Sequence, residues 1–198
     1  MEIIIHRINS IRKLKKIPGR YGVEIDVRSL KSNLILNHEP KKSGDKLSDY
    51  LNNYNNGTIV FNIKEAGIEY EVINLAKKFK IKSFFLLDVE HPFIIKSKKF
   101  VKKNLAVRFS EFEPLALSNE FKRFTEWMWI DTIHKLPINK KNLKIIKNFK
   151  TCLVSPERWK RKKDIKKYLK FFKKVNYKPD AVMTDLNCSR IWEEVKFK

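Results

Sequence analysis

Several side chains near the N-terminus suit the metal-assisted cleavage of a phosphate ester. His6 and His38 each follow an apolar run, and histidine can serve as general acid or base because its pKa lies near the working pH. Glu24 and Asp26 are two residues apart, so on a strand they point to the same side and could share one divalent metal ion. Arg7 could hold an anion with its planar guanidinium group. Together these groups form a candidate site for phosphate chemistry.

Length and composition restrict the class of protein. A chain of 198 residues, 42% of them apolar, is expected to fold as one domain, residues 1–198, around a substantial core. Cys152 and Cys188 show neither a metal-ligand spacing nor a disulfide pattern, which fits a reducing compartment. No apolar stretch approaches the ~20 residues of a membrane span, and the N-terminal residues lack the features of a signal peptide. We therefore expect a cytoplasmic protein.

The formal net charge of +22 points to an anionic partner: nucleic acid, an anionic membrane surface or an acidic substrate. Lysine greatly outnumbers arginine, although arginine is the usual residue for reading bases or holding phosphate with two hydrogen bonds. Such a composition favours nonspecific attraction, and it could equally reflect the drift of a genome. Because the chain has no recognisable nucleic-acid-binding motif, we do not expect nucleic acid as the partner. A steep salt dependence of DNA or RNA binding would revive that hypothesis.

Short β-rich apolar runs recur along the chain, with helical patterns between the later ones. In one such pattern, within 159–175, apolar residues recur at helical spacing and lysines flank them. We expect the apolar stripe to pack on a sheet and the lysines to face solvent; docking on anionic lipid is the alternative. The expected strands cover residues 3–6, 23–27, 58–63, 83–87, 105–109, 127–130, 151–154 and 181–184, with a short extended piece at 34–37.

Strands that alternate with helices predict parallel pairing, because a crossover must bring the chain back to the same edge. Eight such units predict an α/β fold, a small (β/α)8 TIM-type barrel, for which ~200 residues is about the minimum. The first unit is expected to be short, since residues 9–18 have room for two helical turns at most. An open doubly wound sheet is the alternative, but no glycine-rich turn follows the first strand.

Ligands of such a barrel gather at the carboxyl ends of its strands. Lys64, at the end of the third strand, therefore joins the candidate site. Glu157 suits either a site residue or an acid at the start of a helix. Trp127 and Trp129 share one face of a strand, and core packing is a better interpretation for them than stacking on a substrate.

Four motifs therefore stand on the first three strands or close behind them. They are His6-Arg7, Glu24-x-Asp26, His38-Glu39 and Asn62-Ile63-Lys64. Together they resemble the motifs of the glycerophosphodiester phosphodiesterase family, part of the wider phospholipase-C-like phosphodiesterase barrels. The specific motifs lie within residues 6–64, and the layout of strands is similar over most of the chain.

The resemblance implies a divalent-metal phosphodiesterase, with Glu24 and Asp26 as ligands of Ca²⁺ or Mg²⁺. Asn62 stands where the family has a third, acidic ligand, so this site offers one neutral oxygen and is expected to hold a metal less tightly. Ile8 replaces a glycine of the family, and Glu39 replaces an aspartate. The expected substrate is a small glycerol- or polyol-based phosphodiester in lipid metabolism.

The resemblance also suggests roles for the remaining residues. His6 and His38 would act as the acid–base pair, without assignment of which is the acid. Arg7 and Lys64 would stabilise the negative charge that grows on the phosphate oxygens. A rival hypothesis from another class is a degenerate barrel that binds a phosphorylated ligand without catalysis, and Asn62 is its best support. Later acidic residues could compensate for Asn62, namely Glu111, Glu113 or Glu157.

Overall fold

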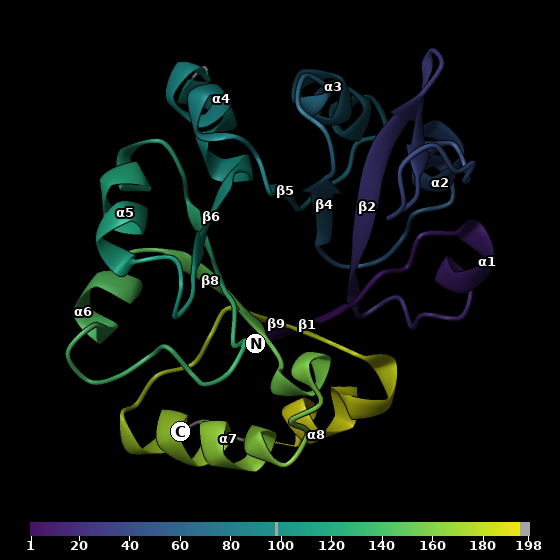
Figure 1. Ribbon diagram of the computed structural model, residues 1–198. Helices are drawn as coiled ribbons and strands as arrows, with labels where there is room; N and C mark the ends of the chain where they lie inside the picture. The colour runs from purple at the N-terminus through teal and green to yellow at the C-terminus, as the bar shows by residue number, and fades with distance from the viewer. Residues whose placement is uncertain (98, 195–198) are drawn as a thin grey trace.

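The structure is a computed structural model that describes residues 1–97 and 99–194. Eight parallel strands surround a central axis, and helices surround the strands (Figure 1). A further strand, β3 (Asn33–Leu36), pairs antiparallel with the end of β2. The eight parallel strands are β1 (Glu2–Ile5), β2 (Gly22–Leu30), β4 (Ile59–Ile63), β5 (Phe84–Leu87), β6 (Ala106–Phe109), β7 (Trp127–Ile130), β8 (Lys150–Val154) and β9 (Ala181–Thr184).

The strands follow the order β5-β4-β2-β1-β9-β8-β7-β6 around the sheet. The two edge strands, β5 and β6, approach each other at a single parallel bridge between Leu86 and Leu105, so the barrel is nearly closed. The predicted (β/α)8 barrel is therefore confirmed, and the open doubly wound alternative is wrong. The boundaries of each expected strand agree with those of an observed strand to within about two residues, except that β2 extends further than the sequence indicated.

The helices of the described chain pack outside the barrel. The first unit is short as predicted, because α1 has four residues and is capped by the Ser10 hydroxyl, which accepts a hydrogen bond from the Lys13 amide. The helices are α1 (Ile11–Leu14), α2 (Leu47–Asn52), α3 (Glu69–Lys78), α4 (His91–Lys96), α5 (Leu115–Glu120), α6 (Leu143–Ile146), α7 (Asp164–Lys174) and α8 (Ser189–Glu193). Short 3₁₀ segments are η1 (Lys99–Asn104), η2 (Phe121–Arg123), η3 (Pro156–Trp159) and η4 (Leu186–Cys188).

Apolar side chains fill two separate regions. The larger core lies between the strands and the helices, and it includes the predicted apolar stripe of α7. A smaller core fills the barrel interior, where Trp127 stacks on Phe85 with ring centroids 4.4 Å apart. Trp127 and Trp129 both belong to this interior core, as predicted.

Strand β2 differs from the other barrel strands in the side chains that it directs into the barrel interior. Its residues Val23, Ile25 and Val27 belong to the outer core, so the alternate positions Glu24 and Asp26 face the barrel interior. The interior apolar core contains residues from the other seven parallel strands and none from β2. The barrel thus has a polar wall on one side, at the level where its strands end.

Candidate active site

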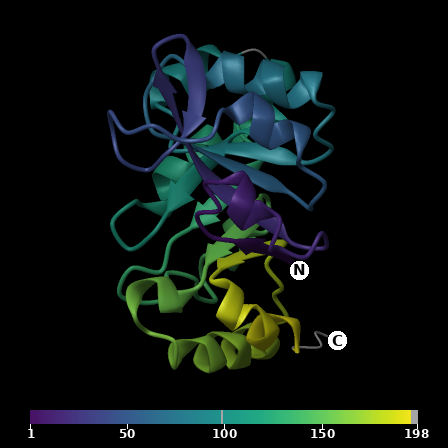
Figure 2. The same cartoon turned by 90° about the vertical axis from the view of Figure 1, so that its right-hand side faces the viewer.

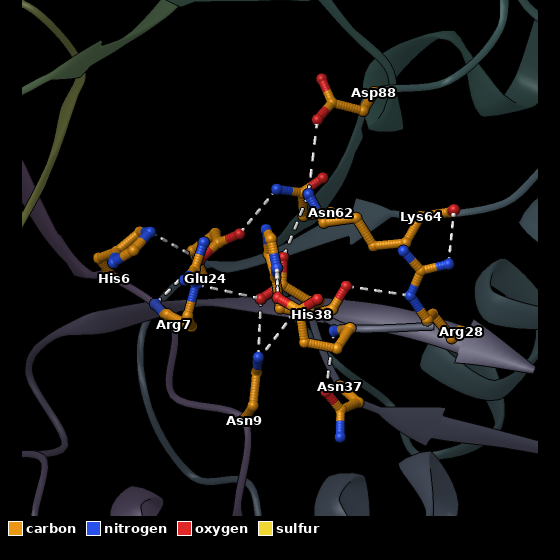
Figure 3. Close-up of polar contacts among 12 residues, drawn as sticks. His6, Arg7, Asn9, Glu24, Arg28, Asn37, His38, Asn62, Lys64 and Asp88 are labelled. Carbon is orange, nitrogen blue, oxygen red and sulfur yellow. Dashed lines mark hydrogen bonds and ion pairs between the residues drawn. The ribbon is translucent and has the colours of Figure 1, made fainter. Parts of the chain in front are cut away.

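Parallel pairing places the carboxyl ends of β1 and β4 on either side of residues 23–27 of β2 (Figure 3). His6 directly follows β1, and its amide donates to the carbonyl of Thr184 at the end of β9. Asp26 on β2 pairs in register with Asn62 on β4, so the two side chains lie on the same face of the sheet. These neighbours place the candidate residues of the first three barrel strands around one point.

Arg7 turns the chain sharply after β1. Its backbone has φ 53°, a left-handed conformation that a residue with a side chain seldom adopts. In this conformation the Arg7 amide donates to Glu24 Oε2 at 2.9 Å, and the next amide, that of Ile8, donates to the Glu24 carbonyl. The turn therefore orients the Glu24 carboxylate while it places the Arg7 side chain at the barrel mouth.

Asp26 is held by an asparagine that the sequence did not single out. Asn9 Nδ2 donates to Asp26 Oδ2 at 2.7 Å, and the Asp26 amide donates to Asn9 Oδ1 at 2.8 Å. The same carboxylate forms ion pairs with Arg7 Nε (3.5 Å) and Lys64 Nζ (3.2 Å). Asp26 is only 1% exposed, and two cations and an amide thus offset the free-energy cost of burying its charge.

Glu24 has fewer partners and is poised between two protonation states. Burial, followed by repulsion from Asp26, raises the pKa of Glu24 to about 7. Asn62 Nδ2 donates to Glu24 Oε1 at 2.9 Å, which favours the charged form only in part. Glu24 can therefore gain or lose a proton near neutral pH.

His6 lies between two carboxylates. Its Nε2 is 3.9 Å from Glu24 Oε2, and its Nδ1 is 4.0 Å from Asp185 Oδ1 at the end of β9. Burial, and then the positive charges of Arg158 and Arg7 among others, lower the pKa of His6 to about 3. The imidazole is thus neutral at working pH, with one ring nitrogen able to accept a proton.

His38 reaches the mouth through the β2–β3 hairpin. The Asn37 amide donates to the Asp26 carbonyl, so the next residue, His38, is held beside the middle of β2. The His38 side chain is 40% exposed, and its Nδ1 lies 2.8 Å from Glu39 Oε1. The charge of His38 also contributes to the lowered pKa of His6, so the two rings share an electrostatic environment. The role assigned to His38 stays a prediction.

The oxygens of Glu24, Asp26 and Asn62 suit a hard divalent cation in their chemistry. Asn62 Oδ1 is buried and has no hydrogen-bond partner, while the Nδ2 of the same amide is used by Glu24. An orphaned amide oxygen beside two buried carboxylates is the type of ligand set that Ca²⁺ and Mg²⁺ prefer. Among the described residues, no group of three or more histidine, cysteine or acidic side chains could hold a metal ion, and a site here would include the amide oxygen of Asn62 beside the two carboxylates.

The opposite side of the mouth carries a second polar network, which spacing alone did not reveal. Arg108 on β6 donates to both carboxylate oxygens of Asp88, at 2.6 and 3.0 Å, and to Asp131 Oδ2 at 2.9 Å. Trp159 Nε1 donates to Asp131 Oδ1 at 2.9 Å. Lys64 Nζ, 3.8 Å from Asp88 Oδ2, links this network to the first cluster. An arginine inside the otherwise apolar strand β6 was the available sequence signal for this network.

The acidic residues that could have compensated for Asn62 bind local donors. Glu157 accepts hydrogen bonds from Thr184 Oγ1, Ser155 Oγ and a backbone amide. Glu111 accepts from the amides at 134 and 135, and Glu113 accepts from Ser110 Oγ. In the part of the chain that the structure describes, these three carboxylates therefore accept hydrogen bonds from nearby loops and do not join Glu24 and Asp26.

Fold and site together define a small (β/α)8 barrel with a buried carboxylate cluster at the carboxyl ends of its strands. No protein-family model matches the sequence, and no curated protein matches it in sequence. Among solved structures, the chain is similar to the crystal structure of glycerophosphodiester phosphodiesterase from Agrobacterium tumefaciens str. C58. The TM-score is 0.65 over 92% of this chain and 96% of that chain, with 10% sequence identity. The structural resemblance expected from the motifs is thus found, and at this identity it is a likeness of fold.

Proposed function

We propose that this protein is a divalent-metal-dependent phosphodiester hydrolase that acts on a small glycerol- or polyol-based diester. The observation that carries the proposal is the orphaned Asn62 Oδ1 beside the buried carboxylates of Glu24 and Asp26, with the neutral His6 next to them. The likeness of fold to a glycerophosphodiester phosphodiesterase supports the same reaction class.

Glu24, Asp26 and Asn62 would hold a Ca²⁺ or Mg²⁺ ion. When bound, such an ion acts as a Lewis acid toward a phosphate oxygen. Glu24 must be ionised to serve as a ligand, and its raised pKa makes binding tighter as pH increases through about 7. Asn9 keeps Asp26 in place by its two hydrogen bonds.

Arg7 and Lys64 would bind the anionic diester. Each forms an ion pair with Asp26 at the mouth, and each can turn toward a phosphate while the carboxylate keeps it near the site. Arg7 is 43% exposed at its side chain, so its guanidinium group is accessible to a ligand. The two cations would stabilise the charge that develops on the phosphate oxygens.

His6 is the candidate proton acceptor. Burial, and after it the neighbouring cations, lower the pKa of His6. A bound anionic diester would offset the charge of those cations and so make the ring more basic. His6 would then take a proton from the attacking water or neighbouring hydroxyl, and His38, which is exposed at the mouth, would give one to the leaving alkoxide. Asp185, close to His6 Nδ1, would orient the ring.

Hydrolysis of glycerophosphodiesters and of a chromogenic diester, measured with Ca²⁺, Mg²⁺ or Mn²⁺, tests the proposal. Turnover should disappear with chelator, in His6→Ala and in Glu24→Ala. The matched control is Glu113→Gln, an acidic residue at the same end of the barrel that binds Ser110, and it should retain turnover. Activity that survives both His6→Ala and chelator would overturn the proposed site.

The second candidate function is a barrel that binds a phosphorylated ligand without catalysis. Asn62 favours it, because the amide supplies one neutral oxygen and spends its Nδ2 on Glu24. This function predicts that glycerol phosphates raise the melting temperature of a folded, inactive protein, and that Arg7→Ala removes the rise. It also predicts that Asn62→Glu, which restores a carboxylate, strengthens metal binding roughly tenfold.

A further inference from the structure

Large apolar side chains are exposed at the mouth of the barrel. Phe112, Trp159 and Leu186 are 65%, 42% and 42% exposed, and they lie in the segments that follow β6, β8 and β9. Because those strands are parallel, these segments emerge at the same end of the barrel. Three other large apolar residues are exposed in the described chain, and they lie on the helices that follow barrel strands. They are Tyr70 on α3, Ile95 on α4 and Leu117 on α5. The loops that precede the strands expose none within the described residues.

Phe112, Trp159 and Leu186 are called the apolar rim below. A hollow lined by basic residues lies next to this rim. Residues 160–167 and Ile191 line a hollow of about 830 Å³ that begins directly after Trp159. Asp164, the acidic residue among them, is engaged by Arg161 (2.6 Å) and Lys167 (2.9 Å). Lys160 and Lys163 are exposed and form no ion pair with a carboxylate in the part of the chain described by the structure. The hollow therefore presents uncompensated positive charge beside exposed apolar groups.

We propose that the apolar rim and the basic hollow dock on the surface of an anionic lipid bilayer. Tryptophan is favoured at the level of the lipid headgroups, and phenylalanine and leucine insert at the boundary between headgroups and acyl chains. Lysines near an anionic membrane contribute about 1 kcal/mol each to binding. A nucleic acid would match the lysines but would leave the aliphatic Leu186 without an apolar partner. No helix of the described residues could span a membrane, so binding would take place at the surface.

The proposal goes beyond hydrolysis and does not need it. Docking at the mouth would place the site of His6 and Glu24 against the lipid surface, where phosphodiesters with apolar tails are found. Binding can be measured on the protein without substrate or metal. Failure to bind vesicles would therefore leave the proposed reaction standing, and failure to turn over a diester would leave the proposed docking standing.

Cosedimentation with vesicles provides the first measurement. The protein should bind vesicles that contain phosphatidylglycerol and bind pure phosphatidylcholine vesicles at least tenfold more weakly. Trp159 gives a second readout, because the other tryptophans, Trp127, Trp129 and Trp192, are buried at 8%, 3% and 0% exposure. Its fluorescence should shift to shorter wavelength on binding, and the shift should be absent in Trp159→Phe.

Two charge variants separate the basic hollow from the overall net charge. Lys160→Gln with Lys163→Gln should weaken binding on the order of 30-fold, from about 1 kcal/mol per charge. The matched control, Lys173→Gln with Lys174→Gln, removes the same charge at the far end of α7 (Asp164–Lys174). That end lies roughly 15 Å away along the helix, beyond the Debye length of about 8–10 Å, so binding should change by less than threefold.

A second pair of variants tests the apolar rim. Phe112→Ser should weaken vesicle binding roughly tenfold, the effect expected for an apolar side chain that leaves the lipid. Ile95→Ser is the matched control, since Ile95 is 53% exposed on α4. Figures 1 and 2 place α4 and α7 on opposite sides of the barrel, so this variant should bind like the unaltered protein.

Several results would overturn the proposal. One is equal binding to vesicles with and without phosphatidylglycerol. Another is an equal loss of vesicle binding in the Lys160/Lys163 and the Lys173/Lys174 double variants. A third is a concentration-dependent dimer, seen by light scattering without lipid, that Phe112→Ser dissociates, because the rim would then be covered by a second copy. A fourth is that the protein binds RNA, that the double variant Lys160→Gln with Lys163→Gln abolishes this binding, and that vesicles do not compete with the RNA.

Discussion

The two sides of the barrel mouth treat their carboxylates differently. On the side of β5 to β8, every carboxylate oxygen of Asp88, Asp131 and Glu157 has a hydrogen-bond donor. On the side of β1, β2 and β4, Asn62 Oδ1 is orphaned, and Asp26 Oδ1 has an ion pair without a hydrogen bond. Asp88, Asp131 and Glu157 have thus completed their bonding within the chain, although Glu111 Oε2, Trp129 Nε1 and Arg161 Nε on their side have no hydrogen-bond partner. The oxygens of Asn62 and Asp26 keep capacity for a ligand beside a second buried carboxylate, Glu24.

The difference also appears in the pKa values. The raised pKa of Arg108 keeps that side chain charged among its carboxylates, as in a structural network. By contrast, the pKa of Glu24 is raised to about 7 and that of His6 is lowered to about 3. Groups displaced from their ordinary pKa values by burial and neighbouring charges are typical of functional sites. The Arg108 network is thus typical of a structural role, and the shifted pKa values of Glu24 and His6 mark the candidate site.

The largest expected effect follows from His6→Ala. Loss of the proton acceptor should reduce kcat/KM for a diester on the order of 1,000-fold. Denaturant unfolding should show a folded variant, because the ring makes no short hydrogen bond to either neighbouring carboxylate. A variant that keeps most of its activity would place the proton acceptor elsewhere and remove the distinction between the two sides.

Asp131→Ala should have the opposite profile. It leaves Arg108 Nη1 and Trp159 Nε1 without their acceptor, while Arg108 keeps its two hydrogen bonds to Asp88. The free energy of unfolding should therefore fall on the order of 2 kcal/mol. Activity per folded molecule should change by less than about tenfold. Asn62→Ala, measured in the same denaturant titration, should cost on the order of 1 kcal/mol, since one hydrogen bond is lost. Equal destabilisation by the two variants would contradict the comparison.

Metal binding provides a third test that needs no turnover. At 100 times its dissociation constant, Ca²⁺ or Mg²⁺ should stabilise the protein by roughly 2.7 kcal/mol. The rise in melting temperature should be larger at pH 8 than at pH 5, because Glu24 is protonated below its pKa of about 7. Asp26→Asn should remove the rise, whereas Glu113→Gln should preserve it. A rise that both variants retain would locate the metal outside the proposed site.

The smallest effect concerns the pH dependence of stability without metal. Folding raises the pKa of Glu24 from 4.5 to about 7, so its proton stabilises the folded state below pH 4.5 and this contribution is lost as pH rises through 7. Glu24→Gln should therefore remove a decline on the order of 2 kcal/mol between pH 5 and pH 8. Urea unfolding in the presence of chelator measures it. A parallel decline in both proteins would show that Glu24 is not the titrating group.

His6 has the opposite sign. Its pKa falls from 6.5 to about 3 on folding, so stability is greatest above pH 6.5 and decreases as the pH falls from 6.5 toward 3. His6→Ala should flatten this acid branch in the same urea titration. The matched control is His134→Ala, whose side chain is 73% exposed and should leave the branch unchanged.

The sequence was sufficient for the barrel and for the position of most candidate residues. Apolar runs of four or five residues, separated by helical patterns, indicated the parallel strands, because a parallel pair requires a crossover. Residues placed after those runs had to meet at one end, and His6, Arg7 and Lys64 do. The extra length of β2 was not predictable, since Arg28 and Ser29 interrupt the apolar run and residues 28–30 pair with β3 instead of a parallel strand.

Local sequence by itself thus determined strand order along the chain, the inward pair Glu24 and Asp26, and the kinds of group available for chemistry. Tertiary structure alone decided which polar atoms are satisfied. Asn9 and Arg108 gave little local sign of holding Asp26 and Asp88, because those partners lie 17 and 20 residues away and meet only when the strands pair. The pKa values of Glu24 and His6 likewise depend on burial and on charges from several strands, which exist only in the folded barrel.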